Sequence, residues 1–203
     1  MAIGLALMLA GSGAFALFSD TETSVGNTFT AGAFDLKVDW EESYNGKQIE
    51  TVPFTDDPKA IFSLDDVKPG DWGEATISLH LENNPGWVNF VIDNIKDIEG
   101  GINEPESEVD DTIDDGELGE RLCLRIWEET DGNNEYEDNE LLIFSGRLKD
   151  RDNLQFNLDG NLETVEREPL ENCENYYIGI SWKIPKEVGN EIQTDSLAFD
   201  MLF

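Results

Sequence analysis

The sequence predicts an all-β fold, an antiparallel jelly-roll-like β-sandwich with an acidic insertion, preceded by an apolar N-terminal segment. Three observations predict this class. Several short stretches alternate apolar and polar side chains, as half-buried strands do. Clusters of Asn, Gly and Pro separate these stretches where turns are expected. After the apolar segment, no long stretch has the period of an amphipathic helix. With 5 Trp and 11 Phe in 203 residues, the chain can form a core and is not expected to be disordered.

The apolar segment, residues 1–16, is expected to be a signal peptide. The run AIGLALMLAGSGAFAL carries no charge, and its length is short for a membrane span but typical of a signal peptide. It ends in an Ala-x-Ala cleavage site at residues 14–16, so we expect a mature chain that begins at Leu17 or close to it. The basic residues that usually precede such a run are missing. A retained pilin-like helix or membrane anchor is therefore the alternative.

The first strands are predicted in the half of the chain before residue 93. Strict alternation over 34–40 places Phe34, Leu36 and Val38 on one face. The Asn45-Gly46 pair is typical of a two-residue hairpin turn, so a second strand is expected to follow it. The other strand candidates in this half are 60–64, 75–81 and 87–92, with turns at 67–71 and 83–86.

An acidic region, residues 99–120, interrupts this pattern. Its irregular composition predicts a long surface insertion rather than a linker between two cores. We therefore expect one sandwich domain over 31–203, with 17–30 as a separate first strand. The strands predicted after the insertion are 122–127, 141–144, 154–158, 176–182 and 196–203.

The charge of the chain restricts its partners. It has 45 acidic and 13 basic residues and a formal net charge of -32. A surface of this sign repels a phosphate backbone, so nucleic acid is excluded as a partner. The same repulsion disfavours docking on anionic lipid headgroups. Three uses of the acidity remain open: solubility in high salt, as in halophiles, divalent cation binding, and self-repulsion offset by counterions.

The two cysteines, Cys123 and Cys173, fit an oxidising destination outside the cytoplasm. A disulfide that closes the long loop between them would contribute roughly 4 kcal/mol in the chain-entropy model. Neither cysteine has the CxxC spacing of a metal or redox site. We expect a structural disulfide; two buried free thiols are the alternative.

Catalytic motifs are missing from the sequence. HExxH, G-x-S-x-G and P-loop patterns do not occur. The single histidine, His80, is opposite in phase to Leu79 and Leu81, so it is expected on the exposed face of its strand. Paired carboxylates carry little information about hydrolysis in a chain this acidic. The sequence therefore predicts that the protein is not an enzyme.

A calcium loop is predicted at residues 129–140. Oxygen-bearing side chains occupy positions 1, 3, 5, 7, 9 and 12 of this stretch, the ligand spacing of an EF-hand loop. Asn134 replaces the usual Gly at position 6 and is the non-Gly residue that best tolerates left-handed backbone. A solvated acidic hairpin is the alternative. The predicted ligands are Glu129, Asp131, Asn133, Glu135, Glu137 and Glu140, and Asp114, Asp115 and Glu117 are further candidates in the insertion.

Three motifs follow the apolar segment in a specific order. They are FSDTE at 18–22, NTFTAGAFDL at 27–36 and KPGD at 68–71. In this order the chain closely resembles the TasA/camelysin family, which is secreted through a signal peptidase of the SipW type. The later segments 176–182 and 188–196 resemble archaeal members, especially those from saline habitats.

The resemblance implies a jelly-roll-like sandwich that serves as a structural subunit of extracellular filaments in biofilm matrix. In such filaments the segment freed by signal cleavage inserts as a strand into the next subunit, so the partner is another copy of the chain and the processed protein needs no membrane. Here the donor would be 17–30, with Phe18, Val25 and Phe29 as anchors. Three alternatives remain: a first strand that pairs within its own subunit, a monomeric calcium-binding surface or adhesion domain, and a secreted camelysin-type metalloprotease.

Overall fold

The computed structural model describes most of the chain after residue 34. The described residues are 35–56, 59–110, 112, 115–149, 151, 153–160 and 166–203. The apolar segment 1–16 and the candidate donor segment 17–30, with Phe18, Val25 and Phe29, lie outside them. The predictions for those segments therefore stay predictions.

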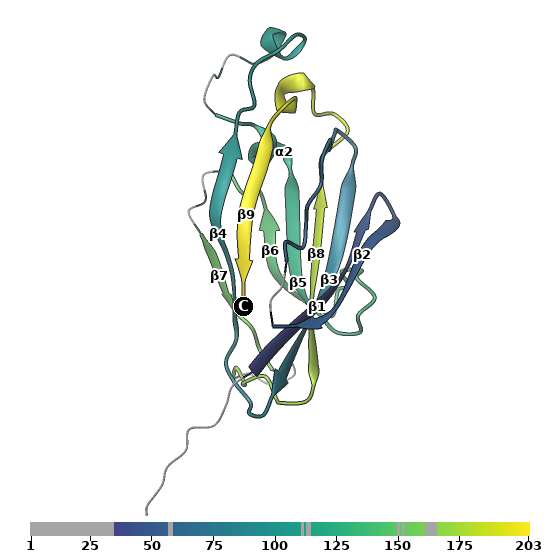
Figure 1. The fold of residues 1–203 in the computed structure, drawn as a ribbon, viewed down its shortest axis with the longest axis vertical. Coiled ribbons are helices and arrows are strands. Elements are labelled where there is room, and N and C mark those ends of the chain that lie inside the picture. The colour runs from purple at the N-terminus through teal and green to yellow at the C-terminus, as the bar shows by residue number, and fades with distance from the viewer. Residues whose placement is uncertain are drawn as a thin grey trace, which may run out of the picture. The chain divides into compact units, whose positions relative to one another are not determined.

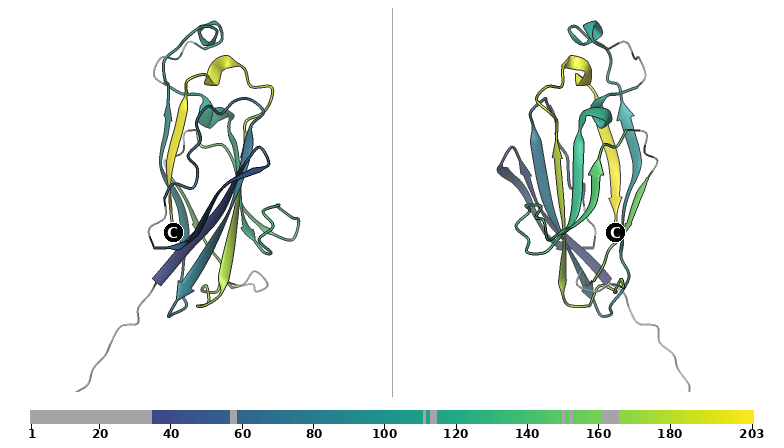
Figure 2. Two further views of the ribbon diagram at one scale, coloured as in Figure 1. Left: turned by 45° about the vertical axis from the view of Figure 1, so that its right-hand side comes forward. Right: turned by 180° about the vertical axis from the view of Figure 1, so that it is seen from behind.

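The described residues form two antiparallel sheets that face one another (Figures 1 and 2). The larger sheet has six strands in the order β2-β1-β3-β8-β5-β6, and the smaller has three in the order β7-β4-β9. This arrangement confirms the predicted all-β sandwich. The strands are β1 (Asp35–Tyr44), β2 (Lys47–Thr55), β3 (Trp72–Glu82), β4 (Asn89–Ile98), β5 (Cys123–Glu129), β6 (Leu141–Gly146), β7 (Leu154–Asn157), β8 (Asn175–Lys183) and β9 (Ser196–Leu202).

The core lies between the two sheets and follows from the alternation in the strands. In β3, Ile77, Leu79 and Leu81 are fully buried, and from the smaller sheet Phe90 and Ile92 meet the same core. Each such side chain contributes about 1.5–3 kcal/mol when it leaves water. The Asn45-Gly46 turn has the positive φ values, 49° and 74°, that a two-residue hairpin requires. The predicted hairpin between β1 and β2 is therefore confirmed.

The candidate strand at 60–64 is wrong. This stretch belongs to the connection between β2 and β3 and pairs with no strand. Its apolar side chains cover the core from a loop, since Ile61 is 4% exposed and Phe62 and Leu64 pack against the core. A short apolar run can be buried without a ladder of hydrogen bonds, and the sequence pattern does not distinguish the two cases.

The acidic insertion is only partly a surface feature. It holds two short helices, η1 (Glu106–Glu108) and α2 (Leu118–Arg121). Glu106 is fully buried, Glu117 is 9% exposed and Leu118 is 5% exposed. The expectation of a surface insertion is therefore wrong for these residues, which are buried near the end of β4 and the start of β9.

The predicted disulfide is wrong, because the two cysteines lie at opposite ends of the larger sheet. Cys123 lies opposite Lys183, which in turn lies opposite Trp72 at the start of β3. The N–H of Cys173 instead donates to the carbonyl of Leu81, near the end of β3 (2.8 Å). From residue 72 to residue 81 an extended strand spans roughly 30 Å, whereas bridged Cα atoms lie about 4.4–6.8 Å apart. Both thiols are free, Cys123 half-buried and Cys173 exposed.

Glu42 is an acidic side chain on the inner face of the larger sheet. It has the strand phase of Val38 and Trp40 and is 3% exposed. Its Oε1 has no hydrogen-bond partner in the described part of the chain. Burial, with a smaller contribution from Glu50, raises the pKa of Glu42 from 4.5 to about 7. Glu42 therefore opposes folding when it is ionised.

The Glu42→Gln variant is expected to be more stable than the parent above neutral pH. Because the folded-state pKa is raised, the native state binds more protons between pH 4.5 and about 7, and the parent loses stability as the pH rises through this window. The variant lacks this loss, so its advantage is on the order of 2 kcal/mol at about pH 8 and vanishes near pH 4. Urea unfolding at several pH values measures it. Glu41→Gln, on the exposed face of the same strand, is the control, and parallel pH profiles for parent and Glu42→Gln would contradict the assignment.

Candidate metal sites and assembly edge

The predicted calcium loop lies on the outer face of the larger sheet, between β5 and β6. Trp127 of β5 faces away from the core cluster and is still only 1% exposed, because the loop folds back over it. Tyr136 packs edge-on against the Trp127 ring, with centroids 6.0 Å apart. Arg125 lies over the Tyr136 ring at 5.2 Å. The indole and this stack fix the loop on the sheet.

The first and last predicted ligands of this loop come together. Glu129 and Glu140 are 5% and 6% exposed, and both carboxylates accept the N–H of Thr130, at 3.1 and 3.0 Å. Glu129 also accepts the indole N–H of Trp127 at 3.1 Å. Burial, followed by the contact with Glu140, raises the pKa of Glu129. Two buried carboxylates this close repel one another when both are ionised, and a cation between them would relieve this repulsion.

The other four predicted ligands are not brought into one group. Asp131 accepts the N–H of Asn133 at 3.0 Å, and Asn133 accepts that of Glu135 at 2.6 Å. Both side chains therefore hold the turn of the loop, while those of Glu135 and Glu137 are exposed. Asn134 has a φ of 62°, the left-handed backbone conformation that an EF-hand-like loop requires at position 6. The six-ligand calcium loop stays a prediction, with its two end carboxylates already together.

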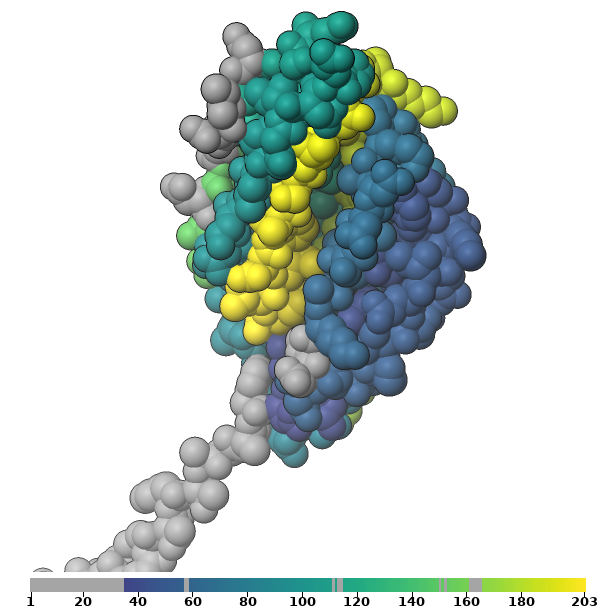
Figure 3. Space-filling view, turned by 45° about the horizontal axis from the view of Figure 1, so that its top comes forward, coloured from purple at the N-terminus to yellow at the C-terminus, as the bar shows by residue number. Residues whose placement is uncertain are grey.

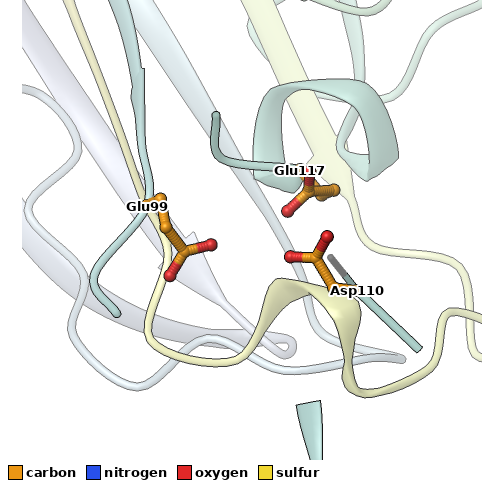
Figure 4. Close-up of side chains that lie close together, drawn as sticks. All are labelled: Glu99, Asp110 and Glu117. Carbon is orange, nitrogen blue, oxygen red and sulfur yellow. The ribbon is translucent and has the colours of Figure 1, made fainter. Parts of the chain in front are cut away.

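A second acidic group, here called the cap cluster, joins the insertion to the start of β9. Two overlapping sets of three side chains have ligand atoms that all lie within 4.8 Å of one another. Figure 4 shows the carboxylates of one set, Glu99, Asp110 and Glu117, turned toward a common space. The other set contains Glu99 with Glu106 and Asp195. Acidic clusters of this kind can hold a metal ion, and Glu99 is common to both sets.

Burial determines the electrostatics around the cap cluster. It raises the pKa of Asp195 to about 6 and that of the neighbouring Asp97 to about 6, and it raises the pKa of Glu117. The N–H of Glu117 donates to Asp195 at 2.6 Å, and the N–H of Gly119 donates to Asp97 at 2.8 Å. Backbone donors therefore compensate only part of the buried negative charge.

The sequence identified one member of the cap cluster, Glu117. Of the other two candidates in the insertion, Asp115 instead pairs with Lys149 at 2.7 Å, and Asp114 lies outside the described residues. Glu99, Glu106, Asp110 and Asp195 were not among the candidates that the sequence indicated. Asp195 is far from the others in sequence, and only the pairing of β9 with β4 brings it to Glu99. No local spacing could have indicated that contact.

His80 does not fit a zinc centre. Its strand phase is confirmed, since Leu79 and Leu81 are fully buried and His80 is not. Its Nδ1 lies 2.8 Å from the Asn175 side-chain oxygen, and its ring lies 5.4 Å from that of Phe54. A catalytic zinc needs three protein ligands, usually with histidines among them. Among the described residues, neither candidate metal group contains His80 or a cysteine.

The strand β9 is an open edge of the smaller sheet. Among the described strands it pairs with β4 alone. Leu197, Phe199 and Met201 pack against the core, and the residues between them are exposed. Figure 3 shows the segment before β3 in blue, next to the yellow β9. This segment, 59–71, is not a strand. In the described part of the chain, three strands and a loop thus face the six-stranded sheet.

These features define an acidic, antiparallel β-sandwich with an open edge and carboxylate clusters. The camelysin metallo-endopeptidase family model matches residues 1–203, so the chain belongs to this family and the resemblance drawn from its motifs is confirmed. Proteins of the TasA/camelysin family are extracellular or attached to the cell surface. No curated protein matches the chain. In the part of the chain that the structure describes, no helix is long and apolar enough to cross a membrane.

Proposed function

We propose that the protein is a structural subunit of an extracellular filament in biofilm matrix and has no catalytic role. Subunits join head to tail, and residues 17–30 of one subunit add as a strand to β9 of the next. The observation that supports this proposal is the open edge of β9 beside a loop that forms no ladder. An open edge exposes unpaired N–H and C=O groups and favours pairing with another chain.

Strand donation of this kind produces a filament rather than a closed dimer. The donor segment and the acceptor edge are different surfaces, so each subunit can give one strand and receive another. Such a heterologous contact propagates when its rotation does not close a ring. The net charge of -32 opposes close association. High salt or divalent cations screen this repulsion and are expected to favour assembly.

Electron microscopy of the secreted protein at native salt tests the proposal. Filaments are expected at high protein concentration, and discrete monomers there would favour the adhesion-domain alternative. Mass spectrometry of the mature N-terminus tests the export step. A terminus near Leu17 would free the donor, whereas an intact segment 1–16 would contradict this mechanism. Loss of casein cleavage on zinc removal would instead support a metalloprotease. Among the described residues, His80 belongs to neither candidate metal group.

We also infer that the loop at 129–140 binds calcium. The buried pair Glu129 and Glu140 supports this inference, because their carboxylates lie together without an ion-paired lysine or arginine among the described contacts. Calcium prefers carboxylate and carbonyl oxygens and accepts irregular loops. A bound ion would offset the repulsion between the two carboxylates and would hold the loop over Trp127.

Calcium is expected to change the fluorescence of Trp127 and to raise the melting temperature. An ion present at a hundred times its dissociation constant stabilises the folded state by about 2.7 kcal/mol. The Glu140→Gln variant should lose the fluorescence change and the part of the stabilisation that this loop contributes, and Trp127→Phe should lose the fluorescence change. Asp138→Asn alters an exposed acid of the same loop that is not a predicted ligand, so it should respond as the parent does. Equal responses of Glu140→Gln and Asp138→Asn would contradict the inference.

A further inference from the structure

The cap cluster gathers acidic side chains from separate parts of the fold. Glu99 follows β4, Glu106 lies in η1, Glu117 precedes α2 and Asp195 precedes β9. Asp110 lies two residues after η1 and completes the set in Figure 4. Segments that carry like charges repel one another unless something neutralises them. The fold nevertheless places them within 4.8 Å in two sets that share Glu99.

Several carboxylate oxygens in this cluster are buried and have no hydrogen bond. Glu106 is fully buried; its Oε2 accepts the N–H of Asn103 at 3.1 Å, while its Oε1 has no partner among the described residues. The same holds for Glu117 Oε2 and Asp195 Oδ1. A buried acceptor without a partner destabilises the fold, and more so when it is charged. Their common location indicates a ligand that accepts electron pairs from several oxygens at once.

The nearby basic side chains do not supply this ligand. Lys149 pairs with Asp115 and also donates to the carbonyl of Gly116. Arg121 pairs with Glu120 and Glu191. Among the described ion pairs, none contains Glu99, Glu106, Glu117 or Asp195. A cation from solution is therefore the partner that the cluster can accommodate.

We propose that the cap cluster binds a Ca²⁺ ion through the carboxylates of Glu99, Glu106, Asp110, Glu117 and Asp195. The donors are all oxygens, which selects hard cations over zinc. Calcium bonds to oxygen at about 2.3–2.6 Å, so oxygens on opposite sides of the ion lie up to about 5 Å apart. Within each of the two sets, the ligand atoms lie close enough to one another for this span. Magnesium holds its ligands closer and keeps several waters, which suits a crowded carboxylate cluster less well.

The ion would fasten the acidic insertion to the start of β9. In the described part of the chain, the Glu117 N–H bond to Asp195 and the Thr194 hydroxyl bond to the carbonyl of Gly101, at 2.6 and 3.0 Å, already connect them, as does the ion pair of Arg121 with Glu191. With calcium, side chains before and after η1 become linked to the residue that precedes β9. This site is separate from the loop at 129–140 and does not depend on strand donation.

Calcium titration of the full chain by calorimetry, in about 1 M KCl to screen the acidic surface, tests the proposal. Glu106→Gln and Asp195→Asn should each weaken one class of sites by about tenfold or more. Glu108→Gln, an exposed acid of the same short helix, should bind as the parent does. Hydrogen exchange should show calcium-dependent protection of 99–117 in the parent and in Glu140→Gln, in which the loop site is removed.

The outcomes separate this site from the others. Loss of protection at 99–117 in Asp195→Asn, with the Trp127 response retained, supports the cap site whether or not Glu106→Gln folds. Unchanged affinity and protection in both cap variants would overturn the proposal. Equal protection by Mg²⁺, or by KCl alone, would overturn the assignment to calcium. Filament formation by either variant leaves this result unaffected, because assembly is measured separately.

Discussion

A mature chain that lacks residues 17–30 is expected to remain monomeric under conditions in which the intact mature chain forms filaments. The reason is that β9 keeps its open edge but no neighbour can supply a strand. The donor contributes a ladder of backbone hydrogen bonds and buried anchors, and each buried Phe or Val is worth about 1.5–3 kcal/mol. Electron microscopy and sedimentation velocity at high salt measure the difference.

Single substitutions in the donor give a sharper form of this experiment. Val25 and Phe29 are an even number of residues apart, so in a strand they point to the same face. Val25→Asp or Phe29→Asp should raise the concentration required for assembly by about a hundredfold, since about 2.8 kcal/mol corresponds to that factor. Thr28→Asp adds the same charge on the face opposite to Val25 and Phe29 and should raise this concentration less.

The monomer distinguishes donation from pairing within one subunit. If residues 17–30 form an ordinary first strand of their own sandwich, their deletion should lower the melting temperature of a dilute, monomeric sample. Strand donation predicts an unchanged melting temperature there, and stabilisation of the deleted chain when a peptide of residues 17–30 is added. Filaments from the deleted chain would contradict strand donation.

Much of the fold could be predicted because the strands alternate strictly. In β3 the buried positions are those that the pattern assigned to the core, and the Asn45-Gly46 turn has the geometry that its residues favour. The failures have a common cause. Ile61 is buried from a loop, and Cys123 and Cys173 are separated by the length of β3. Both outcomes depend on the sheet order, which local patterns do not contain.

Of the two candidate metal sites, the sequence could predict the one formed by neighbouring residues and not the one formed by distant residues. The loop at 129–140 is local, so its ligand spacing and its left-handed Asn134 could be identified in advance. The cap cluster is not local, because Asp195 reaches Glu99 only through the antiparallel pairing of β4 with β9. In a chain with 45 acidic residues, proximity in sequence carries almost no information about which carboxylates meet. What distinguishes the cluster is burial, and burial is a property of the folded chain.

Gly179 of β8 leaves the space that the Trp127 ring occupies. Gly179 lies opposite Trp127 in the larger sheet, and a Cβ there would overlap three atoms of the indole ring. Strand propensity alone would favour Ala over Gly by about 0.5–1 kcal/mol. The steric effect is larger, because overpacking costs about 1–3 kcal/mol and the indole is held by Glu129 and Tyr136.

Gly179→Ala is therefore expected to destabilise the protein by about 3 kcal/mol and to weaken calcium binding in the loop, because the displaced indole loses its bond to Glu129. Urea unfolding and calcium titration measure the two effects.

Ser181→Ala, on the same face of β8, is the control; it adds no atoms, so its stability should stay within about 0.5 kcal/mol of that of the parent. Trp127→Ala alone should cost about 3–5 kcal/mol. In the double variant the two costs should not add, because the clash disappears with the indole. If the two losses of stability add in full, Gly179 is not required to make room for Trp127.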